Sequence, residues 1–261
     1  MTDYKAVFFD IDHTLFSHSQ HRIPESTWQA LRELRRKGIM LFIATGRQYG
    51  EMHVLDEDWS FFDGFVTLNG TLTLDRDGET IISAFPIEGE ARKSVERLFY
   101  DRTLPLLIVE KERMYANMHD GAVEKAQAFL DSPLPVLADI DPEEPIYQLI
   151  FYAGEGREEG VMSLFPGCVG TRWNDFAFDC ISALGGKDKG VSAMMAHYGW
   201  TVDQCIVFGD GGNDVSMLAA CPSSVAMGNG RQEAKDAASF VTKDIDEGGV
   251  AWALEHFGLL L

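Results

Sequence analysis

Short apolar stretches alternate with amphipathic ones in both terminal portions of the chain. Near the N-terminus, apolar stretches over 7–9 and 39–44 flank a segment, 24–38, in which apolar residues recur at helical spacing. Near the C-terminus, the apolar stretch 205–208 leads through a glycine-rich turn into a helical pattern that begins at Val215. Strands that alternate with helices are typical of a parallel sheet that is covered on both faces. We therefore predict an α/β fold for the two terminal portions.

The middle of the chain has a different texture and predicts a second unit. It combines short strand-like and helix-like segments, and none of the polar clusters described below falls in it. We predict that residues 85–180 form an inserted α/β domain and that 1–84 and 181–261 together form one core domain. The expected elements of the insertion are helices over 90–100 and 123–130 and strands over 106–109, 114–116 and 147–152.

Two carboxylates end the first apolar stretch. Asp10 and Asp12 are two residues apart, and side chains at that spacing point the same way in an extended strand. Two carboxylates about 4 Å apart repel each other by about 4 kcal/mol at an effective dielectric constant of about 20, so a cation or a shared proton is needed to hold both there. Mg²⁺ is the natural cation, because it takes carboxylate and phosphate oxygens as ligands. Taken alone, such a pair more often forms a turn or caps a helix.

A second acidic cluster follows the apolar stretch near the C-terminus. Asp210 and Asp214 lie in a segment with three glycines, which permits a tight loop whose backbone can approach a ligand. Asn213 or Asp214 can also cap the helix that begins at Val215. The glycines do not complete the pattern G-x-G-x-x-G, and Asp210 would repel a pyrophosphate, which argues against a nicotinamide-dependent oxidoreductase.

Groups that suit an anionic oxygen occur at two further places. The segment Thr45-Gly46-Arg47 ends the second apolar stretch, and Lys187 and Lys189 open a helical segment. A hydroxyl, the free amides of a glycine turn and a lysine ammonium are typical of phosphate sites. Taken singly, each of these groups is more often structural or solvated.

Asn69 and Gly70 follow a third strand-like stretch, over 65–68. On the sequence pattern alone they form a hairpin turn, because strand alternation resumes over 71–74. A loop that contacts a ligand is the alternative interpretation.

The overall charge restricts the kind of partner. The sequence has 41 acidic and 22 basic residues, which give a formal net charge of −19. A nucleic acid would be repelled, and no basic stripe with interleaved aromatic residues is present, so we expect no nucleic-acid partner. The same charge would repel a phosphorylated metabolite, so the site for one must be made locally positive.

The remaining composition favours a cytoplasmic location. No run of eighteen apolar residues occurs and the N-terminus lacks the long apolar segment of a signal peptide, so we expect no membrane association. The four cysteines show no C-x-x-C spacing and are expected to be reduced thiols. His13, His18 and His21 show no metal-binding spacing and are interpreted as structural or solvated. No feature predicts a protein partner.

Taken together and in this order, the polar segments resemble the four signature motifs of the haloacid dehalogenase-like (HAD) hydrolase superfamily. Further segments at 68–70, 226–229 and 247–251 are similar to those of its Cof-type sugar-phosphatase branch, which carries a type IIB cap. The K-G pair of the third motif favours Lys189 over Lys187. The four segments are Asp10–Thr14 (D-x-D-x-T), Thr45–Arg47, Lys189–Gly190 and Gly209–Asp214 (G-D-G-x-N-D).

The resemblance implies a fold and a set of roles. The core is expected to be a Rossmann-like sheet with the motifs at the carboxyl ends of its strands, and 85–180 an α/β cap that selects the substrate. Asp10 is implied as the nucleophile that forms an aspartyl-phosphate, and Asp12 as the acid and then the base. The implied Mg²⁺ ligands are the carboxylates of Asp10 and Asp210, the carbonyl of Asp12, and Asp214. The implied contacts to the phosphoryl group or the rest of the substrate are Thr45, Gly46, Arg47, Asn69, Lys189 and Asn213.

These features predict a Mg²⁺-dependent phosphatase that hydrolyses small phosphomonoesters, in particular sugar phosphates or related phosphorylated metabolites. Two alternatives remain. A phosphomutase could use the same aspartyl-phosphate and return the phosphoryl group to a second hydroxyl. A non-catalytic, phosphorylatable receiver module would use similar residues, but it needs a much shorter chain and no cap.

Overall fold

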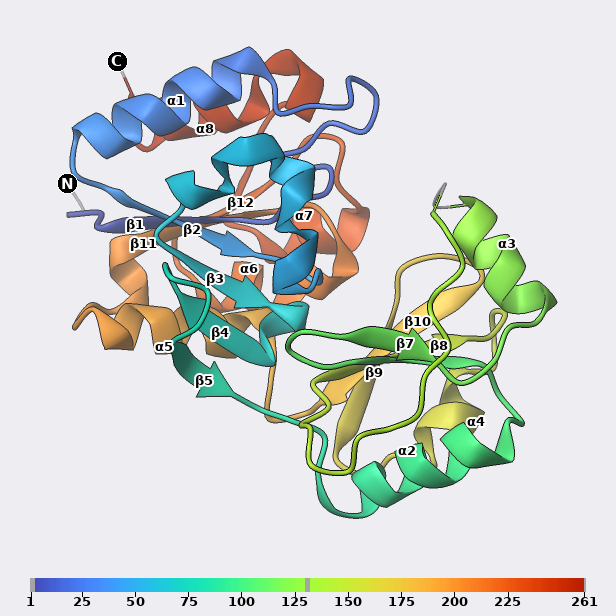
Figure 1. Ribbon diagram of the computed structural model, residues 1–261. Helices are drawn as coiled ribbons and strands as arrows, with labels where there is room; N and C mark the ends of the chain where they lie inside the picture. Colours follow the sequence, from blue (N-terminus) through green and yellow to red (C-terminus); the bar gives the residue numbers. More distant parts are fainter. Residues whose placement is uncertain (1–2, 130–131, 261) are drawn as a thin grey trace. The chain divides into compact units, whose positions relative to one another are not determined.

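The computed structural model describes residues 3–129 and 132–260, and the chain divides into two compact units (Figure 1). Met1–Ser83 and Gly186–Leu261 form the first unit, and Ala84–Gly185 forms the second. The chain therefore leaves the first unit once and returns to it once. The second unit ends later than the predicted insertion, 85–180, because its strand β10 (Ala177–Ser182) continues beyond that limit.

The first unit is built on an eight-stranded sheet in which β1 has neighbours on both sides. Every contact between neighbours from β13 to β3 is parallel, whereas β4 runs antiparallel to β3. The predicted α/β fold with a parallel-sheet core is confirmed. The strand order is β13 (Phe240–Val241), β12 (Ser224–Ala226), β11 (Cys205–Gly209), β1 (Ala6–Phe9), β2 (Met40–Ala44), β3 (Gly64–Thr67), β4 (Leu72–Asp75) and β5 (Ile81–Ala84).

Helices cover both faces of this sheet, with α1 and α8 on one face and α5 and α6 on the other (Figure 1). Ala6 and Phe8 belong to the apolar cluster that also contains residues of α5 and α6, so Val7 and Phe9 face the other side. All four residues are fully buried, which explains why β1 is an uninterrupted apolar run. The helices are α1 (Glu25–Arg36), α5 (Lys187–His197), α6 (Val215–Ala220), α7 (Gln232–Ala237) and α8 (Gly249–His256).

Short 3₁₀ helices connect several of these elements. One of them, η2, makes the turn from β3 to β4, and another, η4, leads from the glycine-rich turn after β11 into α6. They are η1 (Tyr49–Phe61), η2 (Leu68–Gly70), η3 (Val202–Gln204), η4 (Gly212–Asp214) and η5 (Ile245–Glu247).

The second unit has a five-stranded sheet in which all neighbouring strands are antiparallel. An apolar cluster between this sheet and the helices α2 and α4 forms its core, to which α2 contributes Val95 and β8 contributes Phe151. The strands, in spatial order, are β7 (Met114–Ala116), β6 (Leu106–Val109), β8 (Gln148–Tyr152), β10 and β9 (Cys168–Arg172), and the helices are α2 (Gly89–Asp101), α3 (Gly121–Phe129) and α4 (Glu158–Met162).

The elements predicted for the middle of the chain are present, but the prediction is incomplete. The last residue of the predicted helix over 123–130, Leu130, lies outside the described residues. The sequence pattern missed α4, β9 and β10. Across the described ranges, no helix is long and apolar enough to cross a membrane.

Candidate functional site

The polar segments singled out in the sequence follow neighbouring parallel strands of the first unit. Asp10 comes directly after β1, Thr45 after β2 and Asp210 after β11. The backbone N–H of Asp10 donates to the carbonyl of Phe208 at 3.0 Å, which ties the end of β1 to β11. Open α/β sheets bind ligands at the carboxyl ends of their strands, so these side chains lie where a site is expected.

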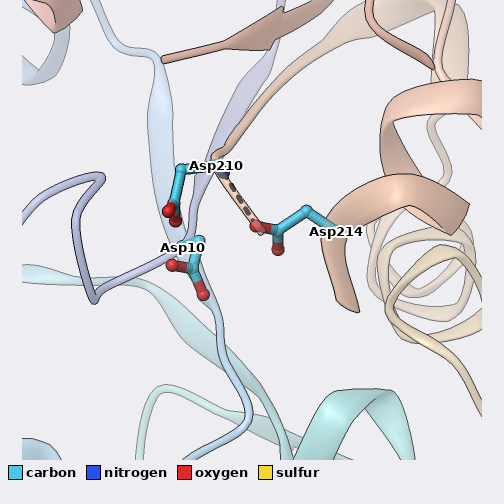
Figure 2. A group of neighbouring side chains, drawn as sticks. All are labelled: Asp10, Asp210 and Asp214. Atoms are coloured by element: carbon cyan, nitrogen blue, oxygen red, sulfur yellow. Dashed lines mark hydrogen bonds between the residues drawn. The ribbon is translucent and has the colours of Figure 1, made fainter. Parts of the chain in front are cut away.

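Three aspartates converge at this edge (Figure 2). Asp10, Asp210 and Asp214 each offer a carboxylate oxygen, and these oxygens all lie within 4.8 Å of one another. Asp214 is completely buried and Asp10 is 5% exposed. Three carboxylates this close together, two of them buried, repel one another strongly, so the cluster, here called the aspartate triad, could hold a metal ion.

The glycine-rich turn fixes Asp214 in the triad. Its Oδ2 accepts hydrogen bonds from the backbone N–H groups of Asp210, at 2.8 Å, and Gly211, at 2.9 Å. A Cβ at Gly209 would lie 2.6 Å from the side chain of Asp214, so only glycine permits this approach. Asp214 also occupies the N-cap position of α6, but its side chain does not cap that helix. The cap interpretation of Asp214 is therefore wrong for its carboxylate.

A buried lysine balances part of this charge. Nζ of Lys187 donates to Oδ1 of Asp10 at 2.6 Å and to Oδ1 of Asp214 at 2.5 Å, and its side chain is fully buried. Burial alone would lower the pKa of Lys187, but Asp10 and Asp214 outweigh it and raise that pKa above its usual range. Lys187 is therefore a permanent cation beside two members of the triad.

Lys189, which the K-G pair favoured, does not lie in this cluster. Its side chain is 56% exposed, and its Nζ pairs with Asp188 at 3.1 Å. The structure thus corrects the prediction that favoured Lys189 over Lys187. The reason is that residues two positions apart in a helix do not share a face, so only one of the two lysines at the start of α5 can point at the triad.

The start of α5 is fixed by a close approach of two glycines. Gly70 has φ 82°, and a Cβ there would overlap the carbonyl oxygen of Gly186, the residue before α5. Glycine at position 70 thus lets the turn between β3 and β4 lie against the beginning of α5. This contact sets the position from which Lys187 reaches Asp10.

Burial and the neighbouring carboxylates raise the pKa values of two members of the triad, Asp210 and Asp10. Burial, with the charge of Asp214 adding to it, raises the pKa of Asp210 to about 7. Burial also raises the pKa of Asp10 well above its usual range, against the opposing charge of Lys187. The triad thus lacks positive charge even with Lys187 present, and a bound cation would supply it.

The Asp12 side chain does not join the triad. Its Oδ1 accepts from Nη2 of Arg47 at 2.7 Å and from Nε2 of His18 at 2.8 Å, and its Oδ2 accepts from Nε of Arg47 at 2.7 Å. Burial alone would raise the pKa of Asp12, but the donors outweigh it and hold that pKa below its usual range. Arg47, predicted as a phosphate contact, is engaged here with Asp12.

The contact from His18 was missed by the sequence reasoning, which interpreted this residue as structural or solvated. No spacing signal could have found it, because it depends on the path of an irregular loop. His13 and His21 in that loop have positive φ angles of 61° and 51°. This backbone conformation cannot be predicted from the residue types, because residues other than glycine adopt it rarely.

Four other predicted residues lie together. Nδ2 of Asn213 donates to Oδ1 of Asn69 at 3.0 Å, and the backbone N–H of Asn69 donates to the carbonyl of Thr45 at 3.0 Å. A Cβ at Gly46 would come within 3.0 Å of Asn69 Oδ1, so Gly46 lies against the same side chain. The turn at Asn69 joins antiparallel strands, as the hairpin interpretation predicted, and it also brings Asn69 to the predicted site residues.

The first unit gathers carboxylates, a buried lysine and backbone amides at the carboxyl ends of parallel strands. This arrangement is typical of enzymes that bind anionic substrates, and its carboxylates could hold a metal ion. Over residues 7–254 the chain matches the model of the haloacid dehalogenase-like hydrolases, and it belongs to that family.

Proteins similar to this chain support its membership of this family. The chain is 30% identical to a protein of Bacillus subtilis (strain 168) named "Putative phosphatase YkrA", over 99% of both chains. A solved HAD phosphatase from Bacteroides thetaiotaomicron has 32% identity and a TM-score of 0.90, covering 98% of this chain and 96% of its own. A solved HAD subclass IIB sugar phosphatase has 32% identity and a TM-score of 0.85, covering 98% of this chain and all of its own.

These findings confirm the superfamily and the Cof-type branch predicted from the motifs. The two solved relatives are phosphatases, and the chain is an enzyme of that kind.

Proposed function

We propose that the protein is a Mg²⁺-dependent phosphatase that hydrolyses small phosphomonoesters of the cytoplasm through an aspartyl-phosphate on Asp10. One observation carries the proposal: the first aspartate of the D-x-D pair lies beside two further aspartates, of which Asp214 is buried, and is bound by Lys187, whereas the second is held apart by Arg47. Two neighbouring carboxylates in different surroundings suit a nucleophile and an acid–base group.

The residues of the triad fit Mg²⁺. Carboxylate oxygens are the hard ligands that this ion prefers, and Asp10, Asp210 and Asp214 would hold it together with the backbone carbonyl of Asp12. When bound, Mg²⁺ neutralises charge on the phosphoryl group and orients it for attack.

In the proposed reaction, a carboxylate oxygen of Asp10 attacks phosphorus, and the bond from phosphorus to the substrate's alcohol oxygen breaks. Asp12 gives its proton to the departing alcohol and then, as a carboxylate, takes a proton from the water that hydrolyses the aspartyl-phosphate. Because Arg47 and His18 stabilise the ionised form of Asp12, the observed arrangement suits the second step. The first step requires that Asp12 carry a proton when substrate is bound.

The phosphoryl oxygens would be bound by positive and polar groups beside Asp10. We assign the cationic role to Lys187 in place of Lys189, because Lys187 alone of the two contacts the nucleophile. Thr45, Asn213 and backbone amides are the proposed neutral donors, and Gly46 and Asn69 line the same place. Fixed donors of this kind stabilise the transition state without having to reorganise.

The inserted second unit is the proposed determinant of substrate choice. None of the proposed catalytic or metal-binding residues lies between Ala84 and Gly185, and this unit has an apolar core of its own. The solved relative of HAD subclass IIB is a sugar phosphatase. This favours a sugar phosphate or a similar phosphorylated metabolite as the substrate. A phosphomutase would use the same aspartyl-phosphate but release no phosphate.

The test is a phosphate-release assay with p-nitrophenyl phosphate and a panel of sugar phosphates, with Mg²⁺ and with excess chelator. We expect release of inorganic phosphate that stops when the metal is chelated, and loss of turnover by about 10⁴-fold or more in a folded Asp10→Asn variant. Isomerised sugar phosphate without free phosphate would identify a mutase, and full activity in chelator would refute the metal-dependent mechanism.

A further inference from the structure

The carboxylate of Asp12 is held by donors from two different segments. Arg47, after β2, contacts both of its oxygens, and His18, in the loop after β1, contacts Oδ1 alone. Oδ1 therefore accepts two hydrogen bonds and Oδ2 accepts one. A guanidinium that grips a carboxylate in parallel fixes the plane of the group but treats its two oxygens alike. His18 is the residue that makes the two oxygens of Asp12 different.

The ring of His18 is placed by its surroundings although it is partly exposed. Its centroid lies 4.5 Å from that of His13, and Phe16 meets it edge-on at 5.2 Å. Aromatic pairs in these arrangements attract each other and restrict ring rotation. The ring is thus oriented before any substrate arrives.

The loop that carries His18 is fastened to a distant part of the first unit. Asp246, in η5, accepts hydrogen bonds from the hydroxyls of Ser17, at 2.6 Å, and Ser19, at 2.5 Å, and from Nε2 of Gln20, at 2.9 Å. These three residues surround His18 in sequence. A single carboxylate that binds three loop side chains restricts the loop more than scattered contacts would. The hydrogen bond from His18 to Asp12 is therefore made from a loop that Asp246 holds in place.

A second fastening acts at the beginning of the loop. Nδ2 of Asn229 donates to the carbonyl of His13 at 2.7 Å, while its Oδ1 accepts from the N–H of Ile245 at 2.9 Å. Asn229 therefore joins the start of the loop to the segment that contains Asp246. Both ends of the path to His18 are anchored to the same neighbouring segment.

We propose that His18 is a positioning residue for Asp12: by occupying Oδ1, it leaves Oδ2 as the oxygen that delivers the proton to the departing alcohol. This inference rests on the proposed function of Asp12. In the step concerned, the bond between Oδ2 and its proton breaks, the proton bonds to the alcohol oxygen as the phosphorus–oxygen bond opens, and Asp12 is left as a carboxylate. Without His18, Arg47 alone holds the carboxylate group, so the group can shift against the guanidinium and its proton can reside on the other oxygen.

A residue that acts through an acid–base group has a distinctive kinetic signature. An alkyl phosphate has a poor leaving group that needs the proton, whereas p-nitrophenolate departs readily without one. A defect in proton delivery therefore lowers kcat/KM of the first ester much more than that of the second. Hydrolysis of the aspartyl-phosphate, in which Asp12 is the base, is common to both esters and does not enter kcat/KM. A defect in folding or a lost contact to the phosphoryl group lowers both values alike.

The experiment compares three variants on glucose 6-phosphate and p-nitrophenyl phosphate. His18→Phe keeps a ring but removes the donor, His18→Gln keeps an N–H donor, and His21→Phe makes the same ring exchange elsewhere in the loop. We expect His18→Phe to lower kcat/KM on glucose 6-phosphate by about 10- to 100-fold, since general acid catalysis contributes about 10²- to 10⁴-fold in all. Its kcat/KM on p-nitrophenyl phosphate should change little, His18→Gln should recover most of the loss, and His21→Phe should behave as the wild type.

Equal losses of kcat/KM on both esters in His18→Phe, or unchanged kcat/KM on both, would each overturn the inference. Failure of the proposed function would be visible separately, as a wild-type protein that hydrolyses neither ester. In that event the crystal structure of His18→Phe decides: a carboxylate of Asp12 that keeps its orientation would overturn the positioning role, and one that turns or loses order would uphold it.

Discussion

The ammonium of Lys187 lies 2.6 Å from the carboxylate of Asp10, and both groups are buried. In the proposed mechanism this contact places a fixed positive charge where the phosphoryl group meets its nucleophile. Lys189, two residues later, has its side chain largely in water. The pair offers a matched test of which lysine serves the reaction.

We expect Lys187→Met to lower kcat by about 10²- to 10³-fold, the usual effect of removing one electrostatic contact to a transition state. Lys189→Met should stay within about twofold of the wild type, because exposed ion pairs contribute little. Steady-state kinetics with saturating Mg²⁺, beside melting temperatures of both variants, checks this. The reverse order, with Lys189→Met the inactive variant, would restore the interpretation based on the K-G pair.

The second prediction concerns Gly70, which lies against Gly186 in a conformation with φ 82°. Gly38 has a similar φ of 77°, but a Cβ there would meet nothing within 4 Å. Gly38→Ala should therefore carry only the backbone cost, about 1 kcal/mol. Gly70→Ala should be less stable than Gly38→Ala and should also lose activity, because the start of α5 must shift and take Lys187 with it.

Chemical denaturation of the two alanine variants, with kcat measured on the folded protein, separates the two effects. If Gly70→Ala were as stable and as active as Gly38→Ala, the close approach to Gly186 would have no part in positioning Lys187.

The third prediction is that Mg²⁺ binding weakens as the pH falls through about 7. In the metal-free protein, burial and the charge of Asp214 raise the pKa of Asp210 to about 7. The ion needs the carboxylate form, so below this pH binding must displace a proton, and above it the site is ready. One proton displaced per ion corresponds to affinity about tenfold lower at pH 6 than at pH 8.

Isothermal titration calorimetry with Mg²⁺ at pH 6 and pH 8, in buffers with different heats of ionisation, measures both the affinity for Mg²⁺ and the number of protons released on binding. Affinity that stays constant from pH 6 to pH 8, with no proton release, would show that Asp210 is not protonated in the metal-free site at pH 6.

The sequence predicted the parts of the molecule in which burial or chemistry leaves a local pattern. Strand β1 was recognisable because all of its residues are buried, and α1 because its apolar residues recur on one face. Strand β9 was missed because it lies at the edge of its sheet, where partial exposure interrupts the apolar pattern. Helix α4 has only five residues, too few for a helical period to show.

The candidate site was predictable as a set of segments but not as a set of contacts. The motifs identified Asp10, Asp210 and Asp214 by type and order, and the structure brings their carboxylates together. The choice between Lys187 and Lys189 depends on where α5 begins, which is set by the contact between Gly70 and Gly186 far apart in sequence. Local patterns carry no information about such a contact.

The last prediction concerns the second unit and uses the face of its sheet that the core does not cover. Phe178 and Cys180 belong to the apolar core of this unit, so Asp179 between them points to the opposite face, where its Oδ1 accepts from Nε1 of Trp173 at 2.9 Å. A carboxylate beside an indole suits recognition of a polyol, because it binds hydroxyl groups while the ring covers C–H groups. If the unit selects the substrate, this face is where we expect the selection.

Asp179→Ala should change the ranking of sugar phosphates, lowering kcat/KM of the preferred one by about tenfold, the value of one good hydrogen bond of a charged group. Turnover of p-nitrophenyl phosphate should stay near the wild-type rate, because the proposed phosphoryl contacts all belong to the first unit. Asp139→Ala, an exposed carboxylate of the same unit, is the matched control and should alter neither. A folded Asp179→Ala protein that keeps its ranking but loses activity on every ester would mean that the second unit serves the chemistry rather than the choice of substrate.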